Sequence, residues 1–509
     1  MHRHQRQPDA VKTLLIVVTI LVATPALAGV RDNDDTCDIK VGPAATLLLP
    51  YFEVDITGNS GQTTLFTVTN VTRYPQIAHV TLWTDRAYPV LTFNLYLTGY
   101  DVQAINLADV LLRNVVAPPN GTSAIATPGP LSASDSANFR GPLDCGSNSG
   151  LIPASLMASI RVALTAGVMG SCATVGNVHG HAIGYATIDV VASCSTRFPN
   201  DPLYYSNDIL FDNVLIGDYQ NLRPQPAWEP PSGSFDATAN PMVHIRAVPE
   251  GGSAGAYVFT GLPYTFYDRY TPAASRTRDR RQPLPSTFAA RFIQGGPAGF
   301  RTNLGVWREG IVPTNSCSGY AANGSRLVTE IVRFDEHENA MLWVGSVNCG
   351  AGCGPFQIEL PAASSTSSLD NDLYPRLVTA DIAGWLYLNL NNGGSTAYSV
   401  TRDVGGRPAP TNNRGNLAPP GATTTSGPRP SQNWVTVTMF GNAGGRNITT
   451  EFDAASLGNG CSPAAFISTA NAGGAPIGPA GGVFACPPGT TLTNGTTTEC
   501  KGTNVNPTP

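Results

Sequence analysis

Alternating apolar and polar residues dominate the first part of the chain. The runs 63–71, 78–85 and 91–99 are rich in Thr, Val, Phe, Tyr and Trp, and short turn sequences such as Tyr74-Pro75 separate them. Successive residues of a strand point to opposite faces, so this pattern is typical of strands with one buried and one wetter face. We predict that residues 44–112 form an antiparallel sandwich.

A second block of strand-forming runs extends from residue 286 to residue 457. The two consecutive segments 302–307 and 329–343 are similar in sequence pattern to the two consecutive segments 63–70 and 78–93. We interpret this similarity as a sign of a degenerate duplication of one sandwich unit. Residues 404–433 are rich in Gly, Pro and Thr, and this composition predicts a flexible loop.

Two stretches predict helices. Residues 154–166 carry apolar side chains at helical spacing, and Pro153 and Gly167 flank them. Proline favours the start of a helix, and glycine favours its end. A shorter helix is predicted at 107–113, where the side chain of Asn106 can cap the free backbone amides.

These patterns predict a mainly β fold with two or more antiparallel β-sandwich domains of the Ig-like kind and one or two short helices. We divide the chain into a signal peptide (1–28), a first sandwich region (29–223) with the packed helix 154–166, a linker and Tyr-rich insertion (224–285), a second sandwich domain (286–457) with the loop 404–433, and a Gly/Ala/Pro-rich tail (458–509) held by disulfides.

The first 28 residues have the pattern of a secretory signal peptide. Basic residues come first, the apolar run TLLIVVTILVA follows, and Ala26-Leu27-Ala28 supplies small residues for cleavage before Gly29. No second apolar run of about 20 residues follows, so we expect no transmembrane segment after cleavage. The predicted location is secreted and extracellular, with the periplasm as the alternative.

All ten cysteines follow the leader, and an even number in an oxidising compartment indicates disulfide bonds. The predicted disulfide cysteines are Cys37, Cys145, Cys172, Cys194, Cys317, Cys349, Cys353, Cys461, Cys486 and Cys500. Many pairings are open. Sequence proximity favours Cys172 with Cys194 and Cys486 with Cys500.

The charge of the chain excludes one class of partner. Charged residues make up 13% of the chain, and the net charge is -5. Nucleic-acid binding needs a basic face to neutralise phosphates, so we expect no nucleic-acid partner.

Strand segments near the start of the mature chain carry a resemblance. LLLPYFEVD (47–55), together with FTVTN, VTLWTD and LTFNLYLTGYDVQ, resembles an uncharacterised group of secreted bacterial proteins with sandwich-like β repeats. The resemblance covers about the first hundred mature residues and implies a β-repeat fold, but it brings no active site to this chain.

One stretch fits a catalytic motif. Residues 251–255 (GGSAG) match G-x-S-x-G and make Ser253 a candidate nucleophile, although the residues that follow predict a strand and not the required helix. His179 and His181 are candidate metal ligands, because alternate residues of a strand share a face. Asp370 and Asp372 offer oxygen donors for a structural calcium ion; no other cofactor is expected.

A group of aromatic residues suggests binding. Tyr264, Tyr267 and Tyr270 could stack on a sugar or on an apolar surface of a partner, although we expect most aromatic residues of this kind to lie in the core. The favoured interpretation is a secreted, non-enzymatic binding or surface-structural protein whose partner is a protein or carbohydrate at a cell surface. Two alternatives stay open: a hydrolase that uses Ser253 or paired carboxylates, and a subunit of an extracellular assembly.

Overall fold

The computed structural model of the 509-residue chain describes residues 39–114 apart from 40 and 59, 139–140, 152–224 apart from 202, 235–247, 266–267, 281–309 apart from 286, 326–342 apart from 338 and 339, 359–360, 363–368, 383–392, 399–401, 424–426, 432–457 apart from 444 and 445, 491–492 and 500–501. Antiparallel strands account for most of these residues, which confirms the mainly β class. The Ig-like assignment stays a prediction.

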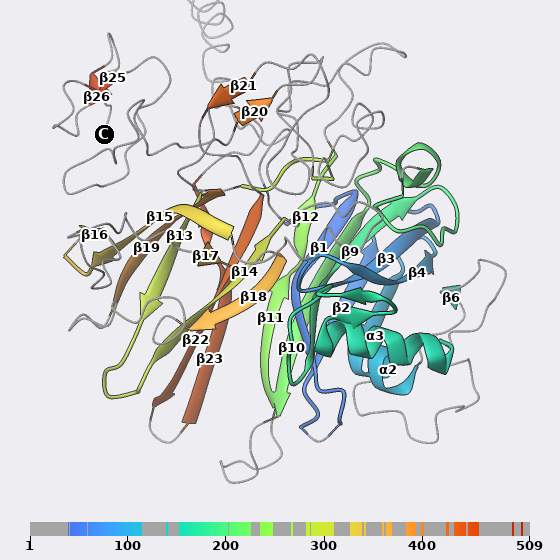
Figure 1. The fold of residues 1–509 in the computed structure, drawn as a ribbon, viewed down its shortest axis with the longest axis horizontal. Helices are drawn as coiled ribbons and strands as arrows, with labels where there is room; N and C mark the ends of the chain where they lie inside the picture. Colours follow the sequence, from blue (N-terminus) through green and yellow to red (C-terminus); the bar gives the residue numbers. More distant parts are fainter. Residues whose placement is uncertain are drawn as a thin grey trace, which may run out of the picture.

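The N-terminal part of the chain forms two antiparallel sheets, which we call the first repeat (Figure 1). The larger sheet has the order β12 (Val243–Ile245), β1 (Thr46–Val54), β9 (Ala182–Val191), β3 (Gln76–Thr84), β4 (Pro89–Leu97) and β6 (Phe139–Arg140). The smaller sheet has the order β11 (Phe235–Pro241), β10 (Leu215–Pro224), β2 (Thr63–Asn70) and β5 (Val102–Asn106).

The C-terminal part forms a second pair of sheets, the second repeat. Its larger sheet has the order β16 (Ala340–Leu342), β15 (Arg326–Asp335), β19 (Ala383–Asn392), β13 (Thr287–Ile293) and β24 (Ala455–Ser456), with β17 (Glu359–Leu360) also paired to β15. Its smaller sheet has the order β18 (Ala363–Ser368), β14 (Arg301–Arg308), β22 (Asn433–Ala443) and β23 (Arg446–Asp453).

Within the part of the chain that the structure describes, three two-stranded ladders lie outside these sheets. They are β7 (Val168–Met169) with β8 (Cys172–Ala173), β20 (Ser399–Thr401) with β21 (Thr424–Ser426), and β25 (Thr491–Leu492) with β26 (Cys500–Lys501). The described part of the stretch 404–433, predicted as a loop, contains β21 and the first residue of β22 (Asn433–Ala443).

The two repeats share one strand topology. The path β12-β1-β9-β3-β4 corresponds to β24-β13-β19-β15-β16, and the path β11-β10-β2-β5 corresponds to β23-β22-β14-β18, with the chain order kept throughout. A tight backbone contact recurs as well. A Cβ atom on Gly184 would lie 2.0 Å from the carbonyl oxygen of Trp83, and one on Gly384 would lie 2.0 Å from that of Phe334. The topology supports the duplication that the sequence suggested.

Each repeat ends in a crossover from its smaller to its larger sheet. In the first repeat, Met242 separates β11 from β12 and its backbone amide donates to Gly217 O at 2.9 Å. In the second, Ala454 separates β23 from β24 and its amide donates to Val435 O at 2.8 Å. The two crossovers are therefore built alike.

Two helices belong to the first repeat, as predicted. The first, α2 (Leu107–Arg113), begins with the Asn106 side chain accepting a hydrogen bond from the amide of Ala108 at 2.9 Å. The second, α3 (Ala154–Ala166), ends at Gly167 in the left-handed conformation and buries one face of four residues, Met157, Ile160, Ala163 and Leu164. A single π-helical turn, η2 (Tyr204–Asp208), follows β9. None of the helices in the described residues is long and apolar enough to cross a membrane.

Two hydrophobic cores organise the molecule. The first lies within the first repeat and joins both its sheets to the helices. The second contains the interior of the second repeat, and it also includes Leu48, Trp83 and Tyr185 from the larger sheet of the first repeat. Tyr185 meets Trp307 of β14 edge-on, with 5.8 Å between the ring centroids. Apolar packing therefore continues from one repeat into the other.

Candidate functional site

A buried polar cluster centres on Asp189 of β9. Asp189 Oδ2 accepts hydrogen bonds from the hydroxyls of Tyr204 and Tyr267, each at 2.7 Å, and Oδ1 lies 3.7 Å from Nε of Arg281. Arg281 also donates to the carbonyl oxygen of Leu210 at 2.6 Å. The side chains of Asp189 and Arg281 are both 0% exposed. The hydrogen bonds of this cluster link distant segments of the fold. Because solvent does not reach these charges, the cluster offers no open binding surface.

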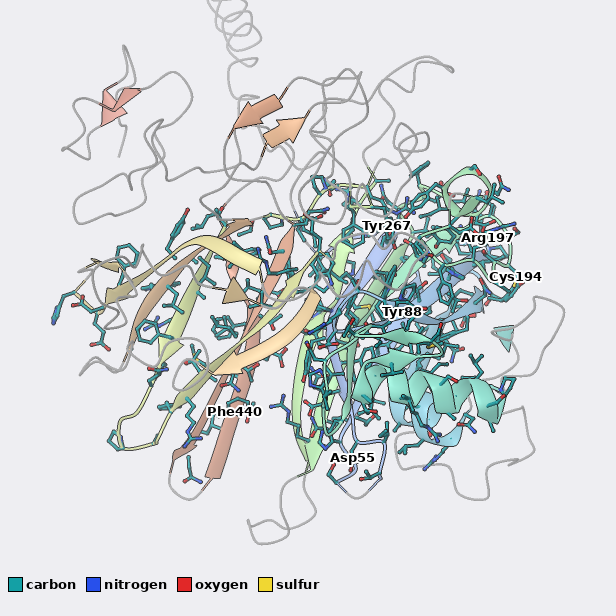
Figure 2. All side chains as sticks on the ribbon, in the orientation of Figure 1. Asp55, Tyr88, Cys194, Arg197, Tyr267 and Phe440 are labelled. Carbon is teal, nitrogen blue, oxygen red and sulfur yellow. The ribbon has the colours of Figure 1, made fainter. Side chains whose placement is uncertain are left out.

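Tyr267, one of the three tyrosines predicted to bind a partner, belongs to this cluster. Its ring is fully buried and lies 4.8 Å from the ring of Phe266. Figure 2 labels Tyr267 among the side chains of the first repeat. Burial, reinforced by the charge of Asp189, raises the pKa values of Tyr204 and Tyr267 well above the ordinary value, so both phenols stay protonated and donate. Tyr264 and Tyr270 lie outside the described residues.

His179 and His181 precede β9, and each pairs with a different carboxylate. His179 Nε2 lies 2.8 Å from Asp85 Oδ2, and His181 Nδ1 lies 2.7 Å from Glu53 Oε1. The two histidines therefore fasten the segment before β9 to β1 and to the turn after β3, and they do not converge on one ion. Within the described ranges, no group of three His, Cys, Asp or Glu side chains is placed to hold a metal.

Several candidate residues lie where the structure gives no description. Ser253, Asp370 and Asp372 are among them, as are Cys37, Cys145, Cys317, Cys349, Cys353, Cys461 and Cys486. Cys172 and Cys194 are described, and neither is a free thiol. The pairing of the ten cysteines stays a prediction.

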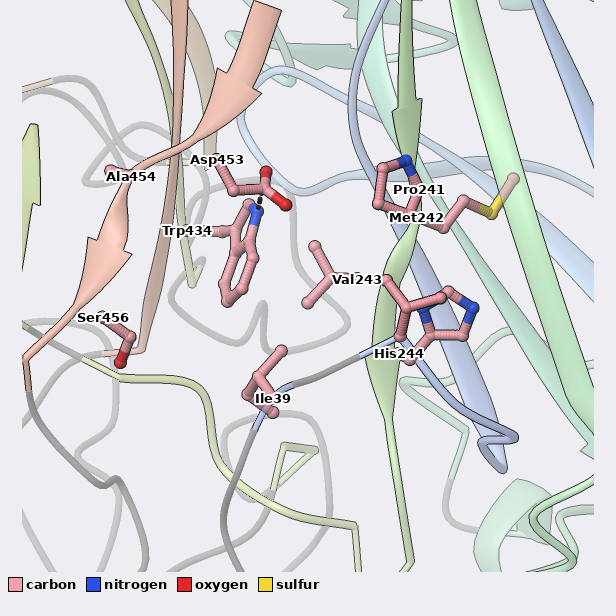
Figure 3. A pocket seen from close by; sticks show the side chains of 10 residues that line it. Ile39, Pro241, Met242, Val243, His244, Trp434, Asp453, Ala454 and Ser456 are labelled. Atoms are coloured by element: carbon pink, nitrogen blue, oxygen red, sulfur yellow. Dashed lines mark hydrogen bonds between the residues drawn. The ribbon is translucent and has the colours of Figure 1, made fainter. Parts of the chain in front are cut away.

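A pocket of about 150 Å³ lies between the crossovers of the two repeats (Figure 3). The wall from the first repeat comes from Pro241, Met242, Val243 and His244, the wall from the second comes from Trp434, Asp453, Ala454 and Ser456, and Ile39 and Val41 complete the lining. Pro241 and Asp453 occupy corresponding positions, since each is the last residue before its crossover. The pocket is thus built from the same element of both repeats.

Asp453 is the charged group of this pocket. Its Oδ1 accepts a hydrogen bond from the indole Nε1 of Trp434 at 2.9 Å, and Figure 3 shows the carboxylate facing the wall formed by Pro241 and Val243. Burial raises the pKa of Asp453 to about 6 against the opposing effect of the Trp434 hydrogen bond, and the charge of Glu451 raises it further. None of the described lining residues is Lys or Arg.

Two contacts cross the boundary between the repeats near the pocket. Glu451, two residues before Asp453 on β23, accepts from Asn240 Nδ2 at 2.8 Å across the boundary between the repeats. The guanidinium of Arg223 on β10 lies 5.7 Å from the ring centroid of Phe440 on β22. The Asn240–Glu451 contact ties the edge strand β11 to the edge strand β23, and the Arg223–Phe440 contact joins the neighbouring strands β10 and β22.

No direct signal in the sequence pointed to this pocket. Its residues are spread from Ile39 to Ser456, and Trp434 and Asp453 each sit in an ordinary alternating strand. The suspected duplication was the one available indication, because paired repeats bring corresponding strand ends together. No protein-family model, curated protein or solved structure matches the chain.

Proposed function

We propose that this chain is a non-enzymatic binding protein and that the pocket between the two crossovers holds its ligand. The observation that carries the proposal is the lining, in which one partly buried carboxylate stands among mostly apolar side chains, with His244 and Ser456 as the other polar residues. A few placed polar groups in an apolar concavity are the usual features of a small-molecule site.

The chemistry of the pocket defines the class of ligand. A cavity of about 150 Å³ is large enough for a molecule the size of benzene. Asp453 accepts a hydrogen bond from Trp434, and its pKa is raised mainly because burial disfavours the charged carboxylate. The ligand we infer is therefore a small apolar molecule that carries an amine or another hydrogen-bond donor.

We favour binding over catalysis because the acidic and basic side chains named here are hydrogen-bonded to the protein itself. The carboxylates of Asp85, Asp189 and Asp208 each accept hydrogen bonds from the scaffold. His79 is buried with both ring nitrogens engaged, by Asn94 Oδ1 and by the carbonyl oxygen of Arg197, each at 3.0 Å. Groups held in this way support the fold and are poorly placed to exchange protons with a substrate.

The test compares three probes of one size at pH 7: benzylamine, benzyl alcohol and toluene. We expect benzylamine to bind most tightly by isothermal titration calorimetry and to quench Trp434 fluorescence. Asp453→Asn should weaken benzylamine at least tenfold and leave toluene unchanged, because only the charged contact is lost. Trp385→Phe is the matched control, since Trp385 lies on β19 outside the pocket.

Two results would contradict the proposal. One is the absence of binding by all three probes. The other is a benzylamine affinity that does not change in Asp453→Asn, which would place the amine elsewhere on the surface.

A further inference from the structure

Two loops at one end of the first repeat are locked together by a buried asparagine. Asn70, at the end of β2, donates to the carbonyl oxygens of Tyr74 and Thr98 at 2.7 and 2.8 Å, and its Oδ1 accepts from the amide of Thr72 at 3.0 Å. The amide of Tyr100 donates to Thr72 O at 2.8 Å. The loop 71–75 and the loop 98–101 therefore form one rigid unit.

The contact between these loops leaves no room for adjustment. A Cβ atom on Gly99 would lie 2.3 Å from the carbonyl oxygen of Arg73. Tyr100 adopts φ +60°, a conformation that bulky residues rarely take and that costs free energy. Glycine would fit this position without strain, yet the chain has a tyrosine. Such an outlier calls for a role of the side chain outside the fold.

The locked loops present apolar surface to solvent. Tyr100 is 70% exposed, and Tyr74 and Val102 are each 58% exposed. The guanidinium of Arg73 lies 4.7 Å from the centroid of the Tyr74 ring and donates to the Tyr74 hydroxyl. Arg73 thus covers one face of this ring and holds its orientation, while the ring as a whole stays largely accessible.

We propose that Tyr74 and Tyr100 form a second binding site, separate from the pocket, that takes the sugar rings of a polysaccharide. A pyranose has an apolar C–H face, which packs on an aromatic ring, and a rim of hydroxyls, which Arg73 can donate to. Rigid loops lower the entropy lost on binding a flexible chain.

The test is affinity electrophoresis of the full chain through gels containing, in turn, soluble β-1,3-glucan, xylan, dextran or mannan. We expect retardation by at least one polysaccharide and at least a tenfold loss of affinity in Tyr100→Gly and in Tyr74→Ala. Tyr100→Gly should melt at the same temperature as the parent or higher, because the φ strain is relieved. Val178→Ala, at a position 81% exposed, is the control and should bind like the parent.

The melting temperature separates a binding role from a structural one. A Tyr100→Gly variant that is less stable would show that the tyrosine serves the fold, and a stable variant that keeps its retardation would remove the ring from the site. Absence of retardation in all four gels would overturn the proposal. None of these residues lines the pocket, so the outcome is independent of the benzylamine experiment.

Discussion

Burial sets the charge of individual residues in this protein, and Asp453 and His244 respond to it in opposite directions. Burial raises the pKa of Asp453 to about 6 and lowers that of His244 to about 4. The acid therefore costs stability when it ionises at higher pH. The histidine costs stability when the unfolded chain takes up a proton at lower pH.

Asp453→Asn should separate these two contributions. In the parent, the unfolded carboxyl ionises above pH 4 while the folded one resists until about pH 6, so the Asp453 contribution is full below pH 4 and is lost as the pH rises. The loss is about 3 kcal/mol at most. We expect the variant to gain stability relative to the parent between pH 4 and pH 7, measured by urea unfolding. The His244 contribution cancels in the comparison, and a difference that is flat with pH would contradict the assignment.

Among the elements, β9 and β19 depend on a glycine where two strands come closest. A Cβ atom on Gly184 would also lie 2.8 Å from the ring of Phe52, and one on Gly384 would lie 2.9 Å from the ring of Phe292. The clash in both cases includes a backbone carbonyl oxygen, which cannot rotate away as a side chain does. The requirement for glycine therefore belongs to the strand pairing and recurs in both repeats.

Alanine at either position should destabilise the protein. We expect Gly184→Ala and Gly384→Ala each to cost about 3 kcal/mol, the upper end of overpacking effects, in chemical unfolding. Gly180→Ala is the matched control, because a Cβ atom there would have nothing within 4 Å and the residue precedes the same strand β9. Equal stability of all three variants would contradict the close contact between the strands at Gly184 and Gly384.

Local elements were predictable from the sequence because their signals are local. The helix 154–166 carries its own apolar face and its terminating Gly167, and the structure has the same bounds. Strand alternation likewise located β2, β3 and β4 within a few residues. The hydrogen bond of Tyr267 to Asp189 was not predictable, since Asp189 lies 78 positions away. The pocket was unpredictable for the same reason, because alternation within a strand does not identify the strand across the gap.

For the whole molecule, we propose export with an oxidised mature chain, on the strength of residues 1–28 and the ten cysteines. Expression of the full sequence in an exporting bacterial host should give a product whose measured mass is that of a chain beginning at Gly29. Its cysteines should not react with iodoacetamide. Ile16→Arg, which puts a charge in the apolar run, should keep Met1 and leave the thiols reactive. An uncleaved parent chain with reactive thiols would contradict the proposal.

The corresponding crossovers carry different side chains, with Pro241 facing Asp453 across the pocket. Two identical repeats would give the pocket two matching walls, and a ligand could then bind in either of two orientations with equal affinity. In this chain one wall is acidic at this position, through Asp453, and the other carries the uncharged Pro241. Substitutions in one repeat can therefore change the ligand selectivity of the pocket while the strand topology of both repeats is kept.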